Sequence, residues 1–487
     1  MKKMIRFMVP SPVLILSIAG VLLGPIRGNP IEFPDADKQT AQFPQGEIIE
    51  QVICPANPDQ SYALYLPSTY DPQVSWPIIY AFDPAARGRV PVKRFSIAAE
   101  KYGYILVGSN NSRNGPWAAN FTAARAMWAD TRERLHIDTT RVYATGFSGG
   151  ARVACEVAYK PQYHIAGVIA HGAGFRQGHG PTHETPFIFY GLVGNEDFNF
   201  LELRDLARIL DDFNIPNRLT VFDGPHDWAD DTICMEAVEW LELQAMQTGT
   251  REKNEDFLDL LFEKTLNQAE EHEKSGRSQL AYRGYLEVSE DFRGLRDIGQ
   301  AETKATQLAA SKEVSRYQRR ERKRREKEER ELQSVGQNFA AIIDPAQRRD
   351  AINTIIRTAS RFQESGKKKY DPAEAQMRAR IRNYIVSLAW NDGLAYLERK
   401  YYPEAVAVLE MWCIIQPDQP APFYHLAGAY AVTREKEKAL TALETAIDNG
   451  FDDLRHIERN PYLFSLQREE AYQQMIMKLE AAQPPGK

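Results

Sequence analysis

The first half of the chain alternates short apolar runs with longer stretches of mixed polarity. Most of the runs are continuously apolar, which is typical of strands that are buried on both faces of a sheet. The run at 62–66 alternates large and small residues in part and is expected to be an edge strand. The continuous runs span residues 77–82, 104–108, 141–147, 165–170, 187–194 and 218–222.

Helical periodicity fills the intervals between these runs. Apolar positions recur three and four residues apart, as they do on one face of a helix. Strands that alternate with helices predict an α/β fold over residues 46–248, with helices on both faces of a mostly parallel sheet of about eight strands. The expected helices span 118–135, 150–159, 200–213 and 229–246.

The pattern changes after Gln247, where β-branched runs end and charged helical sequence begins. We therefore expect an all-α region after the sheet domain. It divides into a helical segment at 249–310, a charged helix or coiled coil at 311–335, and a helical domain at 336–480. Basic residues and glutamates alternate through the charged segment, which favours a solvated helix over a nucleic-acid-binding patch.

Residues 389–450 carry a sequence period of 34 residues. The recurring pairs are Gly393 and Ala427, Tyr396 and Tyr430, Ala405 and Ala439, and Leu409 and Leu443. This pattern resembles the tetratricopeptide repeat, and a degenerate unit is expected within 249–310. The resemblance implies a docking surface for a protein or peptide partner. The alternative is that two repeats only cap the rest of the protein.

Composition and the N-terminus bear on location and partners. The 487 residues are 43% hydrophobic, which is enough for more than one core. The net charge of -6 gives no general attraction to nucleic acid, so no nucleic-acid partner is expected. The basic start and apolar run of residues 1–28 predict a signal peptide and a secreted or periplasmic protein, without stable membrane insertion after cleavage. A retained anchor is the alternative.

The four cysteines are scattered, with no ligand-like spacing to histidine. We therefore expect no metal site and assign no disulfide. Isolated cysteines of this kind are usually small buried apolar residues.

The most informative motif is GFSGG at 146–150, between the apolar run 141–147 and the helical stretch that follows. A strand, a tight turn and a helix form the context that a nucleophilic serine in GxSxG requires. The turn presents Ser148 in a strained conformation, and Gly146 and Gly150 leave room for it. The backbone N–H of Gly149, at the start of the helix, is placed to stabilise an oxyanion.

A serine hydroxyl needs a base to accept its proton and an acid to orient that base. Asp197 follows the run 187–194, and His226 follows the run 218–222. Ser148, Asp197 and His226 thus occur in the chain order Ser, Asp, His that serine hydrolases with parallel sheets use. Glu196 is the competing acid. The alternative is that Asp197 only caps a helix and His226 only satisfies a turn.

The strand–Ser–helix motif and the ordered triad resemble the α/β-hydrolase superfamily over residues 46–248. With the export segment, the chain is similar to the polyhydroxybutyrate depolymerase and feruloyl esterase branch. The resemblance implies hydrolysis of a small-molecule or polymer ester through an acyl-enzyme, without a cofactor. A serine peptidase with the same triad, and a non-catalytic scaffold whose repeats dock a partner, are the alternatives.

The family's second oxyanion donor lies in the loop after the third strand, which often reads HGGG. This chain has Asp83, Pro84 and Ala85 there. Proline has no N–H, so the donor is expected to be Asp83 or Ala85. A carboxylate beside an oxyanion is unfavourable unless Arg87 or Arg89 pairs with it.

A polar and aromatic loop, SNNSRNGPW at 109–117, follows the run 104–108 at the same edge of the sheet. Asn110, Asn111 and Trp117 are expected to bind polar groups of a substrate. Trp228, close to the predicted base, is expected to line the acyl pocket or to anchor the next helix. An asparagine-rich turn without a ligand is the alternative for the loop.

Overall fold

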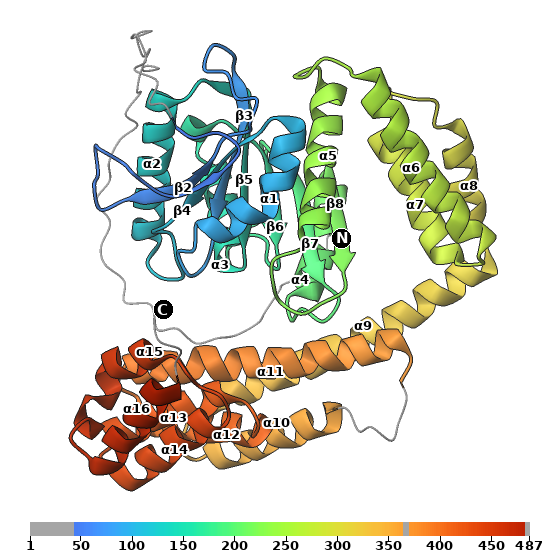
Figure 1. Cartoon of the computed structure of the whole chain (residues 1–487). Coiled ribbons are helices and arrows are strands. Elements are labelled where there is room, and N and C mark those ends of the chain that lie inside the picture. Colours follow the sequence, from blue (N-terminus) through green and yellow to red (C-terminus); the bar gives the residue numbers. More distant parts are fainter. Residues whose placement is uncertain (1–42, 364–369, 483–487) are drawn as a thin grey trace, which may run out of the picture. The chain divides into compact units, whose positions relative to one another are not determined.

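The computed structural model describes residues 43–363 and 370–482 (Figure 1). The signal segment expected at 1–28 lies outside the described residues. The chain divides between Lys323 and Arg324 into two compact units. We call them the sheet unit, which ends at Lys323, and the helical unit, which begins at Arg324.

Within residues 43–363, eight strands form one sheet in the order β1-β2-β4-β3-β5-β6-β7-β8. β2 pairs antiparallel with β1 and β4, and the other neighbours are parallel. This strand order, with an antiparallel β2 and a strand–Ser–helix turn between β5 and α3 (Gly149–Ala158), is that of the α/β-hydrolase fold. The strands are β1 (Ile48–Ile53), β2 (Ser61–Tyr65), β3 (Trp76–Phe82), β4 (Ile105–Ser109), β5 (Ile137–Phe147), β6 (Ile165–His171), β7 (Ile188–Gly194) and β8 (Asn217–Phe222).

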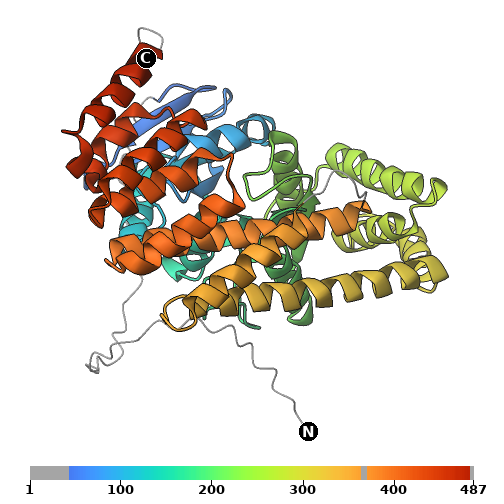
Figure 2. The same ribbon diagram turned by 90° about the horizontal axis from the view of Figure 1, so that it is seen from below.

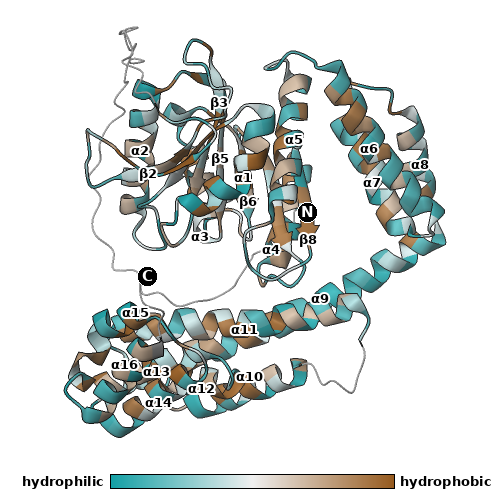
Figure 3. Ribbon diagram, viewed as in Figure 1, coloured by the Kyte–Doolittle hydropathy of each residue, from teal (hydrophilic) through white to brown (hydrophobic). Residues whose placement is uncertain are grey.

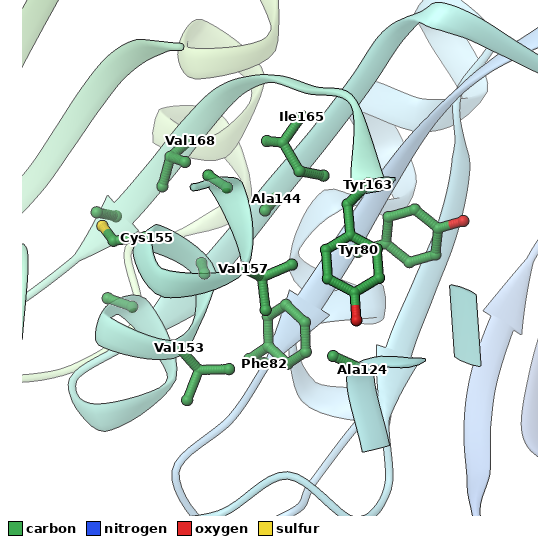
Figure 4. Close-up of a cluster of buried hydrophobic side chains, with 14 of the residues drawn as sticks. Tyr80, Phe82, Ala124, Ala144, Val153, Cys155, Val157, Tyr163, Ile165 and Val168 are labelled. Atoms are coloured by element: carbon green, nitrogen blue, oxygen red, sulfur yellow. The ribbon is translucent and has the colours of Figure 1, made fainter. Parts of the chain in front are cut away.

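Helices cover both faces of the sheet, as the apolar runs predict. Consecutive residues of β5 belong to opposite cores. Ala144 belongs to the core that includes residues of α2, α3 and α4, whereas Tyr143 belongs to the core that includes residues of α1 and α5. Figure 4 shows part of the first core, where Val153 and Val157 of α3 meet Phe82. The helices are α1 (Arg89–Tyr102), α2 (Trp117–Arg134), α3 (Gly149–Ala158), α4 (Phe200–Asp212) and α5 (Asp231–Thr248).

Two elements of this unit escape the sequence patterns, β1 and α1. Strand β1 is IIEQVI, and most of its side chains are at least partly exposed, so it lacks a continuous apolar run. Helix α1 contains Pro91. Because Pro91 lies in the first turn, its missing N–H costs no helical hydrogen bond.

Three further helices belong to the sheet unit: α6 (Glu255–Lys274), α7 (Ser278–Asp291) and α8 (Gly299–Ala309). Helix α7 is fixed to the sheet by polar contacts. The Trp240 indole N–H donates to Asp291 at 3.0 Å, and Arg218 of β8 pairs with Glu287 at 3.5 Å and with Asp291. Residues of α6 and α7 line, together with β8, a cavity of about 300 Å³. Helix α7 thus lies beside the edge strand β8, whose residues all remain partly exposed.

The charged segment is one long helix, α9 (Lys312–Ala341), which is hydrophilic along most of its length (Figure 3). The boundary expected at 335 is therefore wrong, because the helix continues to Ala341. The expectation that this helix is solvated on all sides is also wrong. Glu328 is buried and accepts two hydrogen bonds from Arg380 of α11, at 2.6 and 2.7 Å. One face of α9 is thus part of the helical unit's core.

The helical unit, drawn in gold to red in Figure 2, has a hydrophobic core of its own. Helices that follow one another pack as pairs, α11 with α12 and α13 with α14. The helices after α9 are α10 (Arg348–Phe362), α11 (Pro372–Glu398), α12 (Tyr402–Ile415), α13 (Pro420–Val432), α14 (Lys436–Asp448), α15 (Leu454–Arg459) and α16 (Glu470–Ala482).

Candidate active site

Ser148 stands between β5 and α3 in a strained backbone conformation, with φ 52° and ψ -119°. This positive φ is unfavourable for a residue with a side chain. The neighbouring glycines are required by close contacts. A Cβ added to Gly146 would overlap the carbonyl oxygen of Gly150, and one added to Gly150 would overlap that of Phe82. The GFSGG sequence thus lets a strained serine sit at the carboxyl end of the sheet.

Asp197 lies in the loop after β7 and is completely buried. Its Oδ1 accepts the backbone N–H of Asn199 at 2.7 Å, which fixes the carboxylate. A Cβ added to Gly194 would overlap the carbonyl oxygen of Gly224. The loops after β7 and β8 are therefore pressed together, which brings the acid toward the predicted base.

His226 lies in the loop after β8, and its Nδ1 is 2.9 Å from Asp197 Oδ2. Its ring contacts the rings of Phe147, at a centroid distance of 4.6 Å, and Phe198, at 4.2 Å. It also lies against Gly172, where an added Cβ would be 2.9 Å from the ring. The imidazole is therefore fixed by one carboxylate and by contacts with two aromatic rings.

The backbone of Ser148 is hydrogen-bonded next to the glycine that contacts His226. Its N–H donates to the carbonyl oxygen of His171 at 2.8 Å, one residue before Gly172. Among the described residues, the Ser148 hydroxyl forms no hydrogen bond with His226. Such bonds often form only when substrate is bound. The fold thus brings the three residues to one edge of the sheet, with the predicted acid and base already hydrogen-bonded.

The DPAARG loop after β3 is organised around the Asp83 carboxylate, which is completely buried. Arg87 donates to both of its oxygens, at 2.8 and 2.9 Å, and the Trp228 indole N–H donates to Oδ2 at 3.0 Å. Of the two expected partners, Arg87 makes the ion pair. The bond to Asp83 raises the pKa of Arg87.

The donors predicted for the oxyanion have different surroundings. Gly149 N–H is at the start of α3, where the helix dipole favours negative charge. The Ala85 N–H donates to Asp83 Oδ1 at 2.9 Å, so it is already occupied. The Asp83 nitrogen would be 3.2 Å from a Cβ added to Gly150, next to the turn.

Three of the expected substrate-binding side chains have structural roles here. The Asn111 carboxamide bonds to the backbone of Ser61 and Asp59, at 2.8 and 2.9 Å. Asn110 donates to the carbonyl oxygen of Glu50 at 3.0 Å. Trp228 is buried against Asp83, which fits its alternative interpretation as an anchor.

Trp117, the fourth of these side chains, is partly exposed at the start of α2. Its ring lies 4.8 Å from the guanidinium of Arg176 and 6.0 Å from the ring of Phe121. It remains a candidate for substrate contact.

His171 was not selected from the sequence as a candidate base, because it precedes Asp197 in the chain. It is buried beside Trp228, at a centroid distance of 4.5 Å, and its Nδ1 accepts the Ala229 N–H at 3.4 Å. Burial, with a smaller effect of Arg94, lowers its pKa to about 3. His171 is therefore a neutral packing residue behind the site.

No family model matches the chain, and no curated protein matches it in sequence. Solved structures of similar fold include an S-formylglutathione hydrolase from Staphylococcus aureus, 14% identical over 37% of this chain and 90% of that chain, with a TM-score of 0.31. A ferulic acid esterase is 13% identical over 40% and 98%, with a TM-score of 0.32. Thermogutta terrifontis esterase 2 is 13% identical over 42% and 96%, with a TM-score of 0.34. These matches assign no residue of the site.

The described part of the chain, residues 43–363 and 370–482, holds no group of three His, Cys, Asp or Glu side chains that could bind a metal ion. It contains no helix both long and apolar enough to cross a membrane. The cysteines, Cys54, Cys155, Cys234 and Cys413, are all free and buried.

Proposed function

We propose that this protein hydrolyses carboxylic esters through an acyl-enzyme intermediate formed on Ser148. The observation that carries the proposal is the Asp197–His226 hydrogen bond beside a strained serine at the carboxyl edge of the sheet. An ionised carboxylate has no proton, so the proton of this bond sits on His226 Nδ1. His226 Nε2 is then left as the base.

In the first half of the reaction, the Ser148 hydroxyl gives its proton to His226 Nε2 while its Oγ bonds to the ester carbon. The carbonyl electron pair moves to oxygen, and the Gly149 N–H stabilises the charge that develops there. The intermediate then expels the alcohol, which takes the proton back from His226. Water repeats the sequence on the acyl-enzyme and releases the acid.

The test compares the purified chain with a Ser148→Ala variant on p-nitrophenyl acetate and butyrate. We expect hydrolysis by the unchanged chain, covalent labelling of Ser148 by a fluorophosphonate, and loss of both in the variant. A folded chain with neither turnover nor labelling would show that the hydrolase fold serves as a scaffold. Turnover of peptide substrates in preference to esters would identify a serine peptidase.

We also propose that the protein is exported and that α11–α14 form two units of the tetratricopeptide type. The basic and apolar start of the sequence supports export. For the repeats, Ala405 and Ala439, 34 residues apart, are both fully buried, and a Cβ added to Gly393 would lie 2.8 Å from Leu409. Close helix pairs of this kind suit a surface for a peptide or protein partner.

A further inference from the structure

The loop after β4 and the loop after β3 are joined beside the Ser148 turn. The Asn114 N–H donates to the carbonyl oxygen of Pro84 at 2.8 Å, and Arg113 forms a β-bridge with Ala85. The β4 loop is fixed on its other side as well. Asn120 Oδ1 accepts the Arg113 N–H at 2.9 Å and the Ser112 hydroxyl at 2.8 Å. Residue 114 is therefore held in place by bonds on both sides.

The asparagines around this loop have different hydrogen-bonding states. The carboxamides of Asn110, Asn111 and Asn120 bond to neighbouring protein groups. In the described part of the chain, the Asn114 carboxamide has no hydrogen-bond partner. Its side chain is also exposed. The loop thus presents one uncommitted donor and acceptor to solvent.

That carboxamide lies against the residue after the nucleophile. A Cβ added to Gly149 would overlap Asn114 Oδ1 and would lie 3.0 Å from Cγ and 3.6 Å from Nδ2. A half-turn about the Cβ–Cγ bond exchanges the amide oxygen and nitrogen at nearly the same positions. The NH2 group can therefore face the space beside the Gly149 N–H.

The loop after β3 offers few free backbone N–H groups that could serve as the second donor to an oxyanion. Pro84 has no N–H, and the Ala85 N–H is held by the buried Asp83 carboxylate. That carboxylate is itself fixed by Arg87 and Trp228, so releasing Ala85 would disturb a buried ion pair. The remaining backbone candidate is the Asp83 N–H.

We infer that Asn114 is a catalytic residue of the proposed ester hydrolysis, with its side-chain NH2 as the second donor to the oxyanion. The inference rests on the proposed function. When Ser148 Oγ bonds to the ester carbon and its proton passes to His226, the carbonyl oxygen gains the electron pair. It then accepts one bond from Gly149 N–H and one from Asn114 Nδ2. Both bonds are strongest in the charged intermediate, so they lower the barrier rather than tighten substrate binding.

The test is the steady-state kinetics of Asn114→Ala and Asn114→Asp with p-nitrophenyl butyrate. Loss of one oxyanion donor is expected to lower kcat about 10²- to 10³-fold with little change in KM. The Asp variant has the same size but places a carboxylate near the oxyanion, so its kcat should be at least as low. A fluorophosphonate should still label Ser148 completely in both variants, at a reduced rate.

The outcomes separate this inference from the proposed function. If Ser148→Ala is inactive but both Asn114 variants keep the kcat of the unchanged chain, the Asp83 N–H is sufficient and the inference is wrong. If the unchanged chain neither hydrolyses esters nor reacts with the fluorophosphonate, both fail together. If Asn114→Ala does not fold, the isosteric Asp variant decides. A raised KM with unchanged kcat would contradict an oxyanion role.

Discussion

The acid of the proposed site is a choice between the adjacent residues Asp197 and Glu196, and the structure gives each a different environment. Asp197 is buried and bonded to both His226 Nδ1 and the Asn199 N–H. The backbone N–H of Glu196 donates to Gly224, which holds the loop against its neighbour. A carboxylate on Nδ1 keeps the other ring nitrogen free to accept a proton. The proton position on His226 therefore depends on Asp197.

Replacing Asp197 by Asn tests this dependence. An amide has similar size, but its NH2 group would favour the wrong tautomer of His226, so we expect kcat to fall about 10⁴-fold. The measurement is ester hydrolysis under saturating substrate, with circular dichroism to show that the fold persists. Glu196→Gln is the matched control and should keep its activity. The reverse result would make Glu196 the acid.

At the scale of elements, loops from distant parts of the sequence meet at Asp83. Trp228 precedes α5 and donates to Asp83 from 145 residues away, whereas Arg87 donates from within the same loop. A buried carboxylate is costly unless its oxygens accept hydrogen bonds. The two loops are therefore stabilised by one shared group.

Trp228→Phe removes the indole N–H and keeps an aromatic ring. We expect a loss of about 1–3 kcal/mol in the free energy of unfolding, because one bond to a buried charge is lost. Urea unfolding followed by circular dichroism measures this loss. Trp117→Phe is the matched control, because within residues 43–363 and 370–482 the Trp117 indole N–H makes no hydrogen bond and its ring makes only packing contacts. Equal losses in both variants would contradict a role for the bond.

Some strands and loop positions could be predicted from the sequence, and others could not. Strands buried on both faces require continuous apolar runs, so the largely buried β3 to β7 could be predicted, whereas the half-exposed β1 could not. The partly exposed β8 could be predicted because the apolar run at 218–222 continues to its end. The loops after β7 and β8 follow adjacent parallel strands, which predicts that Asp197 and His226 lie near each other. The position of Asn114 could not be predicted. It depends on the hydrogen bond that the Asn114 N–H donates to the Pro84 carbonyl oxygen and on the bond that the neighbouring Arg113 N–H donates to Asn120 Oδ1, and both are set by the folded loops.

At the scale of the whole molecule, the two units have separate hydrophobic cores. The proposed active site lies wholly in the sheet unit. The helical unit contains the buried Arg380–Glu328 pair, which joins α11 to α9. A change to that pair should therefore act on one unit and leave the chemistry of the other intact.

Arg380→Leu removes the guanidinium that donates to both oxygens of the buried Glu328 carboxylate. Breaking a buried ion pair in this way costs about 3–5 kcal/mol, so the melting transition of the helical unit should move down in calorimetry. Ester hydrolysis at the assay temperature should persist. Lys478→Ala, which removes an exposed ion pair with Asp448, should leave the transition in place. Loss of hydrolysis in the Arg380 variant would show that the units depend on each other.

The four cysteines of the chain are free and buried in the folded protein. Burial raises the pKa of each thiol, to about 11 for Cys54 and about 12 for Cys413. The thiolate is the form that oxidises and exchanges, so the folded chain keeps its sulfur in an unreactive state. Once folded, the chain is therefore expected to keep the same four thiols whether it is handled in a reducing or in an oxidising buffer.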